Sequence, residues 1–100
     1  MTNQEILRTL LEKLLSANFP GGEGLGEIIG SLERLFESLT ERSSSLGHSY
    51  YEFFKTAEVI WVSCLEAKRP MGENEMRVIK RLLKKLEVDV GRELEATQND

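Results

Sequence analysis

The chain of 100 residues lacks the cysteines of a disulfide framework, the histidines and cysteines of a common metal site, and the long apolar run of a membrane span. It has one cysteine, one histidine and two prolines. A single thiol forms neither an internal disulfide nor a cysteine-rich zinc site, so nothing indicates an oxidising compartment. The longest apolar run is VIWV at 59–62, far short of the roughly 20 residues that a membrane span needs. The N-terminal stretch lacks the pattern of a signal peptide, and we expect a cytoplasmic protein without a membrane span.

Glutamates are numerous, but the combinations of residues that acid–base and metal sites need are scarce. The Glu-x-x-His pairs of di-metal helical bundles are absent. Asp89 is the only aspartate besides the C-terminal residue. Cys64 lies among apolar neighbours, which favours a buried small side chain over a nucleophile. We therefore expect no cofactor and no metal site, and a non-enzymatic protein is favoured over an enzyme.

Apolar residues recur with the period of an α-helix through almost the whole chain. The pattern predicts four helices, at about residues 3–17, 25–41, 49–68 and 73–95, and no segment alternates as a strand does. We predict an all-α protein with one helical domain over 1–96 and a frayed tail at 97–100. Short loops between the helices favour an antiparallel four-helix bundle. A pair of helical hairpins whose core is completed by dimerisation is the alternative.

The segment FPGGEGLGEIIG, at 19–30, holds five of the eight glycines. A phosphate-binding Walker loop needs a lysine and a hydroxyl after its glycines, and both are missing. A dinucleotide-binding loop follows a strand, whereas helices are predicted on both sides here. The segment is therefore predicted to be an interhelical turn, with Gly26 and Gly30 permitting a close approach between helices.

Arg42, His48 and Tyr50 form an R-x5-H-x-Y pattern between the second and third predicted helices. The pattern resembles the signature of the HEPN family, small all-helical proteins that often act as metal-independent ribonucleases. The resemblance implies that Arg42 binds an RNA phosphate and that His48 is the acid–base group, with Tyr50 at the position of a tyrosine in one toxin branch. The residues alone also suit a structural interpretation, in which Arg42 ends a helix and His48 lies in a loop.

The stretch 77–86 carries five basic side chains and no acidic one. They lie opposite the apolar seam of the fourth predicted helix and comprise Arg77, Lys80, Arg81, Lys84 and Lys85. Such a face suits nucleic-acid phosphates, an acidic membrane surface or an acidic protein partner. It also suits a solvated helix surface that pairs with the acidic remainder of a chain whose net charge is −4.

The third predicted helix carries more apolar side chains than one core-facing side needs, because Tyr51, Val59 and Val62 fall outside that side. Such a surplus indicates a second buried face. We predict a two-fold homodimer across this helix, with a contribution from the leucine face of the first helix.

The function favoured by the sequence is that of a small interaction protein, an adaptor, regulator or subunit of a larger assembly, which binds a protein partner or itself through helix surfaces. A nucleic-acid-associated subunit that uses 77–86 and a HEPN-like ribonuclease that uses Arg42 and His48 are the alternatives.

Overall fold

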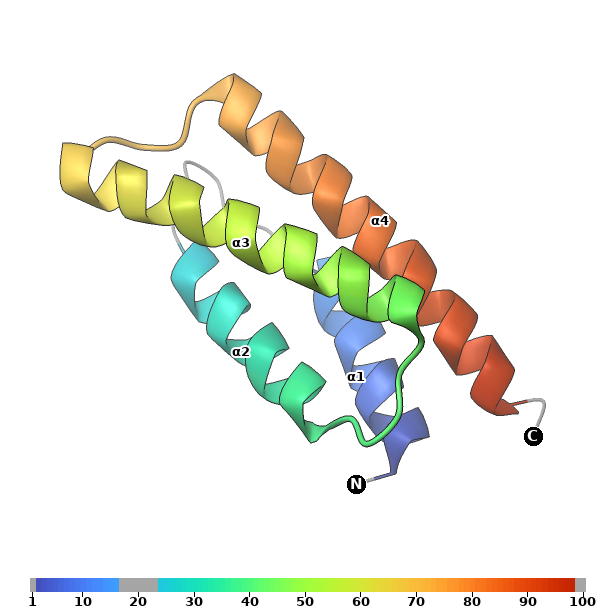
Figure 1. Cartoon of the computed structure of the whole chain (residues 1–100). Coiled ribbons are helices and arrows are strands. Elements are labelled where there is room, and N and C mark those ends of the chain that lie inside the picture. The colour runs from blue at the N-terminus through green and yellow to red at the C-terminus, as the bar shows by residue number, and fades with distance from the viewer. Residues whose placement is uncertain (1, 17–23, 99–100) are drawn as a thin grey trace.

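The computed structural model describes residues 2–16 and 24–98, which form four α-helices (Figure 1). The helices are α1 (Asn3–Ser16), α2 (Leu25–Ser38), α3 (Ser44–Ala67) and α4 (Glu73–Gln98). Each helix packs on the next along the chain, and α1 and α4 pack together and close the ring. The predicted all-α, antiparallel four-helix bundle is confirmed. In this arrangement α1 lies diagonally across from α3, so the leucine face of α1 is not continuous with the outer side of α3.

Side-chain caps explain where two of the helices begin. Thr2 Oγ1 accepts a hydrogen bond from the Glu5 amide at 3.2 Å, at the predicted start of α1. Ser43 caps α3, because its hydroxyl accepts a hydrogen bond from the Leu46 amide at 3.1 Å. The third helix therefore begins at Ser44 and not at residue 49. The serine-rich stretch between the predicted second and third helices is the cap and first turn of α3.

The other helix ends also differ somewhat from the prediction. α2 ends at Ser38 rather than at residue 41, because Leu39 is already extended. The chain is held there by Asn3, whose side-chain oxygen accepts hydrogen bonds from the amide and the hydroxyl of Thr40. α4 continues to Gln98, past the predicted end at residue 95. The predicted last residue of the first helix, 17, and the end of the predicted tail, 99–100, lie outside the described residues.

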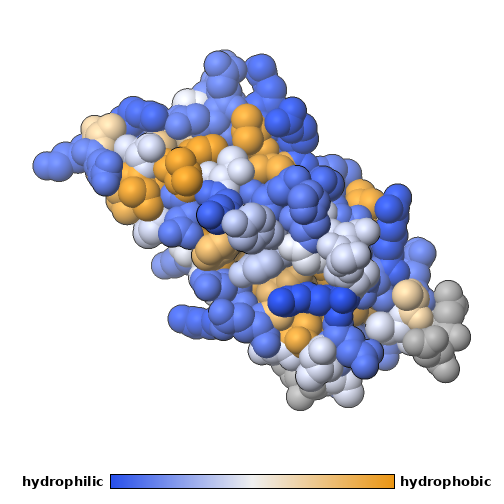
Figure 2. Space-filling view, viewed as in Figure 1, coloured by the Kyte–Doolittle hydropathy of each residue, from blue (hydrophilic) through white to orange (hydrophobic). Residues whose placement is uncertain are grey.

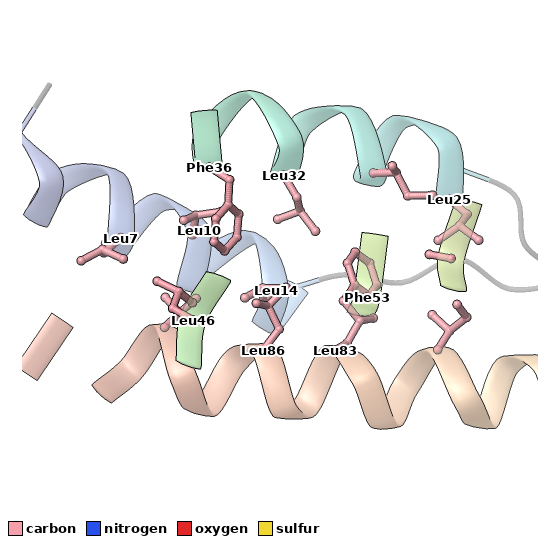
Figure 3. Close-up of a cluster of buried hydrophobic side chains, with 14 of the residues drawn as sticks. Leu7, Leu10, Leu14, Leu25, Leu32, Phe36, Leu46, Phe53, Leu83 and Leu86 are labelled. Carbon is pink, nitrogen blue, oxygen red and sulfur yellow. The ribbon is translucent and has the colours of Figure 1, made fainter. Parts of the chain in front are cut away.

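All four helices contribute side chains to one apolar core, in which Leu10, Phe36, Leu46 and Leu86 are fully buried (Figure 3). Phe53 of α3 is 1% exposed and points into the same interior. A buried polar pair joins two helices within this core, since the Ser49 hydroxyl of α3 donates a hydrogen bond to Asp89 of α4. The core therefore uses one side of α3, and this leaves the opposite side of that helix facing outward.

Gly26 of α2 marks a close contact with α3. A methyl group at Gly26 would lie 2.7 Å from Cζ2 of the Trp61 indole, so the ring packs directly on the glycine backbone. A methyl group at Gly30 would meet no heavy atom within 4 Å. The predicted close approach is thus present at Gly26 and absent at Gly30. Most of the predicted turn before α2 lies outside the described residues.

Candidate functional site

The most distinctive surface of the molecule is the side of α3 that faces away from the core. Several large apolar side chains are exposed there, with exposed fractions of 57% for Tyr51, 65% for Val59, 38% for Val62 and 57% for Leu65. Figure 2 shows hydrophobic side chains gathered over the C-terminal half of α3. We define the α3 outer face as Tyr51, Phe54, Lys55, Glu58, Val59, Val62 and Leu65.

A groove runs along the middle of the α3 outer face. Its volume is about 370 Å³, and it is lined by Phe54, Lys55, Glu58, Val59, Val62 and Ser63. Phe54 is half-buried and packs against the core cluster. Both charged residues of the groove are exposed, and Lys55 Nζ lies 5.3 Å from the centroid of the Tyr51 ring. The groove lining thus combines three apolar side chains with one serine and one charge of each sign.

Helical geometry explains why the sequence builds two apolar sides on α3. Leu46, Phe53 and Ala57 are separated by seven and four residues, so they repeat on the core side. Tyr51 and Val62 belong to a second seam, on the far side of the helix, whose steps of three and four residues pass through His48, Tyr51, Lys55, Glu58, Val62 and Leu65. Two parallel seams of this kind give a helix two surfaces on which another helix can pack.

The sequence interpretation found Tyr51, Val59 and Val62, and all three lie on this outward side. Lys55, Glu58 and Leu65 were not among the residues predicted for this side. The three-and-four spacing through residues 51–65 was the available signal. The two charges obscured this signal, since charged residues at helical spacing are typical of any solvated surface.

A larger pocket of about 620 Å³ lies at the C-terminal end of α3. Trp61, Cys64 and Leu65 line it from α3, and Pro70 and Met71 line it from the connection to α4. Cys64 is half-buried rather than buried, with its Sγ 3.6 Å from Nη1 of Arg69. The arginine is already engaged by a carboxylate, so this pocket presents apolar walls and a neutralised cation.

The carboxylate that holds Arg69 is that of Glu75, in the first turns of α4. The guanidinium donates to both carboxylate oxygens, at 2.7 and 3.1 Å. The Gly72 amide donates to the same carboxylate at 2.9 Å. The Arg69 hydrogen bond and, after it, the Gly72 amide lower the pKa of Glu75 to about 2. This forked pair ties the end of α3 to the start of α4.

The three residues of the HEPN-like pattern are not gathered at one point. Arg42 Nη1 donates to the Phe36 carbonyl oxygen at 3.1 Å, and the Tyr50 ring stacks on the Phe36 ring with centroids 4.0 Å apart. His48 is exposed on another side of α3, with its Nε2 2.8 Å from Glu52 Oε1, because residues two apart on a helix do not face the same way. The structure thus brings Arg42 and Tyr50 to the same phenylalanine and turns His48 toward other partners.

The environment of Tyr50 suppresses the ionisation of its phenol. Burial, followed by the negative charges of Glu33 and Glu37, raises the pKa of its phenol to about 12. The opposing charge of Arg42 lowers that pKa but does not prevail. Tyr50 therefore stays neutral at physiological pH and acts here as part of an aromatic stack that also includes Phe54.

The five basic residues of 77–86 are all exposed on α4. Lys84 pairs with Glu87 at 3.2 Å, and Lys85 pairs across to Glu52 of α3 at 3.4 Å. The Lys85 hydrogen bond and charge lower the pKa of Glu52. Within the described ranges, Arg77, Lys80 and Arg81 make no ion pair of this kind, so most of the basic face is not neutralised by the acidic side chains of the bundle.

Three other findings bear on the class of this protein. Over residues 2–16 and 24–98, no group of three or more histidine, cysteine, aspartate or glutamate residues is arranged to hold a metal ion. No helix in the same ranges has the length and apolar character that crossing a bilayer requires. Comparison of the chain with protein-family models, curated proteins and solved structures found no significant match.

Proposed function

We propose that this protein is a non-enzymatic interaction protein, an adaptor, regulator or assembly subunit, that binds its partner through the α3 outer face. The observation that carries this proposal is the exposure of Tyr51, Val59, Val62 and Leu65 along one helix that already buries its opposite side in the core. Exposed apolar patches with a polar rim are typical of protein interaction sites. Tyrosine and phenylalanine are also enriched in such interfaces.

The chain offers a matched pair of variants for testing this proposal. Val62 on the α3 outer face and Val88 on α4 are both exposed helix valines, with exposed fractions of 38% and 43%. Replacing either with glutamate adds one negative charge at a helix surface. Only Val62→Glu places that charge in the groove of the α3 outer face. Val88→Glu sits between Lys84 and Arg92, one turn away on either side, so it should be well tolerated.

The experiment is affinity capture from native lysate of the source organism with three immobilised baits, the wild type, Val62→Glu and Val88→Glu. We expect proteins that the wild type and Val88→Glu retain and that Val62→Glu loses by tenfold or more on quantitative mass spectrometry. An untagged copy of the chain is added to the lysate, so that self-association is scored with the same readout. Identical retained sets on all three baits would contradict the proposal.

The basic face of α4 supports a second candidate, binding of nucleic acid. Its specific support is the exposure of Arg77, Lys80 and Arg81 without ion-pair partners in the described part of the chain. Binding of labelled single-stranded RNA should then weaken steeply with salt, since each neutralised phosphate releases counterions. Charge reversal of Lys80 and Arg81 should weaken it further. Binding that is absent at low salt, or that ignores both salt and charge reversal, would exclude this candidate.

A further inference from the structure

The charges on the α3 outer face identify what kind of partner fits it. The seam carries Lys55 and Glu58 at its centre, with Tyr51 toward the N-terminal side and Val62 toward the C-terminal side. Resting on the function proposed above, we infer that the occupant is a second copy of this chain, with its α3 packed antiparallel to the first. The two-fold axis of this dimer crosses α3 at the level between positions 56 and 57.

In that register the seam is self-complementary. Lys55 and Glu58 are equidistant from the axis, so each lysine lies opposite the partner's glutamate, and the two-fold symmetry makes this contact twice. Tyr51 and Val62 are likewise equidistant, so each aromatic ring meets a valine. These are the facing layers of an antiparallel helix pair with a seam of three- and four-residue steps. The outermost layer pairs the exposed Leu65 with His48.

The flanks of the seam fit the same arrangement. Phe54 and Val59 lie on either side of the central charges and line the groove with them. In the dimer they would shield the two ion pairs from water, which strengthens the attraction between the opposite charges. The Tyr51 ring, over which Lys55 Nζ is already placed, would be covered by Val62 of the second copy.

The same charges oppose the other simple arrangement of two helices. A parallel, in-register pair would place lysine on lysine and glutamate on glutamate at the centre of the contact. Like charges that face each other in a partly desolvated seam are a common means of excluding an unwanted pairing. The seam thus both favours the antiparallel register and disfavours the parallel one.

The small size of the α3 outer face indicates a weak association between the two copies. α3 has 24 residues, which at about 1.5 Å per residue gives a helix of about 36 Å. A contact along one helix pair falls near the lower end of specific interfaces, below about 1,200 Å² in total, where association is weak and transient. We therefore expect a dissociation constant on the order of 10 µM. The dimer should form and dissociate with concentration and not persist as an obligate assembly.

The test uses charge reversal at the two central positions, followed by sedimentation velocity from about 1 µM to about 200 µM, a range that spans the expected dissociation constant. The wild type should shift from monomer to dimer across this range. Lys55→Glu and Glu58→Lys should each weaken association at least tenfold, because each substitution creates two like-charge contacts by symmetry. An equimolar mixture of the two variants should regain dimers at wild-type concentrations, since opposite charges then face each other in the heterodimer. Both positions are exposed, so the variants should fold, and circular dichroism checks that they do.

A second measurement determines the orientation. In a Cys64→Ser background, Tyr51→Cys and Val62→Cys chains are mixed and mildly oxidised. The antiparallel register predicts a disulfide between position 51 of one chain and position 62 of the other, with little product from either chain alone. Each chain then carries one cysteine, so a disulfide forms only between chains. A disulfide between two chains at position 51 would indicate parallel packing and overturn the inference.

The outcomes separate the inference from the proposed function. A wild type that stays monomeric up to 200 µM overturns the homodimer, and so does a charge-reversed mixture that fails to associate. If Val62→Glu still loses captured proteins in that case, the α3 outer face binds a different protein and the proposed function stands. If the dimer forms and responds to charge as expected while no other protein is lost from Val62→Glu, self-association is the role of the face.

Discussion

α3 and α4 are the two longest helices and pack against each other, yet their outward sides are built differently. The outward side of α4 carries Arg77, Lys80, Arg81 and Lys84, together with one exposed valine. The outward side of α3 carries Tyr51, Val59, Val62 and Leu65 with only two charges among them. Both helices bury a comparable inner side, so the bundle does not require this difference. Folding alone therefore does not explain the exposed apolar side chains of α3, and a function of this side does.

Truncating one inner and one outer side chain of α3 tests whether only the inner side stabilises the fold. Phe53→Ala should lower the free energy of unfolding by about 3–5 kcal/mol, because it removes a fully buried ring and leaves a cavity. Tyr51→Ala should change it by less than about 0.5 kcal/mol, as exposed positions do. Urea unfolding at about 1 µM, where the monomer should dominate, gives both values. A large loss for Tyr51→Ala would place that residue in the monomer's core and remove the contrast between the two sides.

The inner side of α4 provides the matching control. Leu86 is fully buried, so Leu86→Ala should cost about 2–5 kcal/mol. Arg81→Ala, on the outward side, should be close to neutral. If the outer variants of both helices are neutral for stability, their different chemistry cannot be ascribed to folding.

The next effect concerns the polar pair that joins the two helices. Ser49→Ala leaves the buried Asp89 carboxylate without its hydroxyl donor, and should cost about 1–3 kcal/mol. The double variant Ser49→Ala with Asp89→Leu removes both polar groups, and should recover most of that loss, since replacing both partners with apolar groups is often nearly neutral. Thermal unfolding of the three proteins measures this. A double variant that is less stable than Ser49→Ala would mean that Asp89 has other essential contacts, such as that with Arg92, whose Nη1 lies 3.9 Å from Asp89 Oδ1.

Much of this architecture was predictable from the sequence, and the exceptions have physical reasons. The seam of α4 and the inner side of α1 follow from the spacing of Ile79, Leu83 and Leu86 and of Leu7, Leu10 and Leu14, because helical period and burial coincide there. The start of α3 was predicted five residues too late, since a run of serines is compatible with both a loop and a cap. Apolar character alone groups Leu65 with its neighbours Trp61 and Cys64, but its helical position puts it on the outward seam, where it is exposed.

The candidate site was predictable only in part. The surplus of apolar residues identified the α3 outer face, because no single helix partner could cover both sides of the helix. The importance of Lys55 and Glu58 depends on which side of α3 faces outward, and a single sequence cannot determine that. Likewise, the HEPN-like spacing of Arg42 and His48 does not determine which way either side chain points in the folded protein. The capped helix begins before His48 and thereby turns its side chain away from Tyr50.

A smaller effect tests how α3 is seated on α2. In Gly26→Ala the added methyl group would lie 2.7 Å from the Trp61 ring, so the indole must move. The cost of overpacking, about 1–3 kcal/mol, is offset by about 1 kcal/mol from the better helix propensity of alanine. We expect a net loss below about 2 kcal/mol, together with a shift in tryptophan emission, which reports this site alone because Trp61 is the only tryptophan. Gly30→Ala is the matched control and should stabilise the helix without a spectral change, since it meets no neighbouring atom.

The smallest expected effect is a dependence of stability on acid at the junction between α3 and α4. Arg69 and the Gly72 amide lower the pKa of Glu75 to about 2 in the folded protein, against 4.5 for an ordinary glutamate. A lowered folded-state pKa means that the contribution of this carboxylate is present in full above about pH 4.5, and is lost as the pH falls toward 2. Glu75→Gln should therefore lower the melting temperature at pH 7, and its difference from the wild type should shrink between pH 4.5 and 2. The effect should be small, because the pair is at the surface and screened by solvent.

The control is Glu95→Gln, because Glu95 is an exposed glutamate of α4 for which the described residues show no ion pair. A Glu75→Gln deficit that stays constant from pH 7 to pH 2 would show that the side chain stabilises the junction by packing and not by its charge.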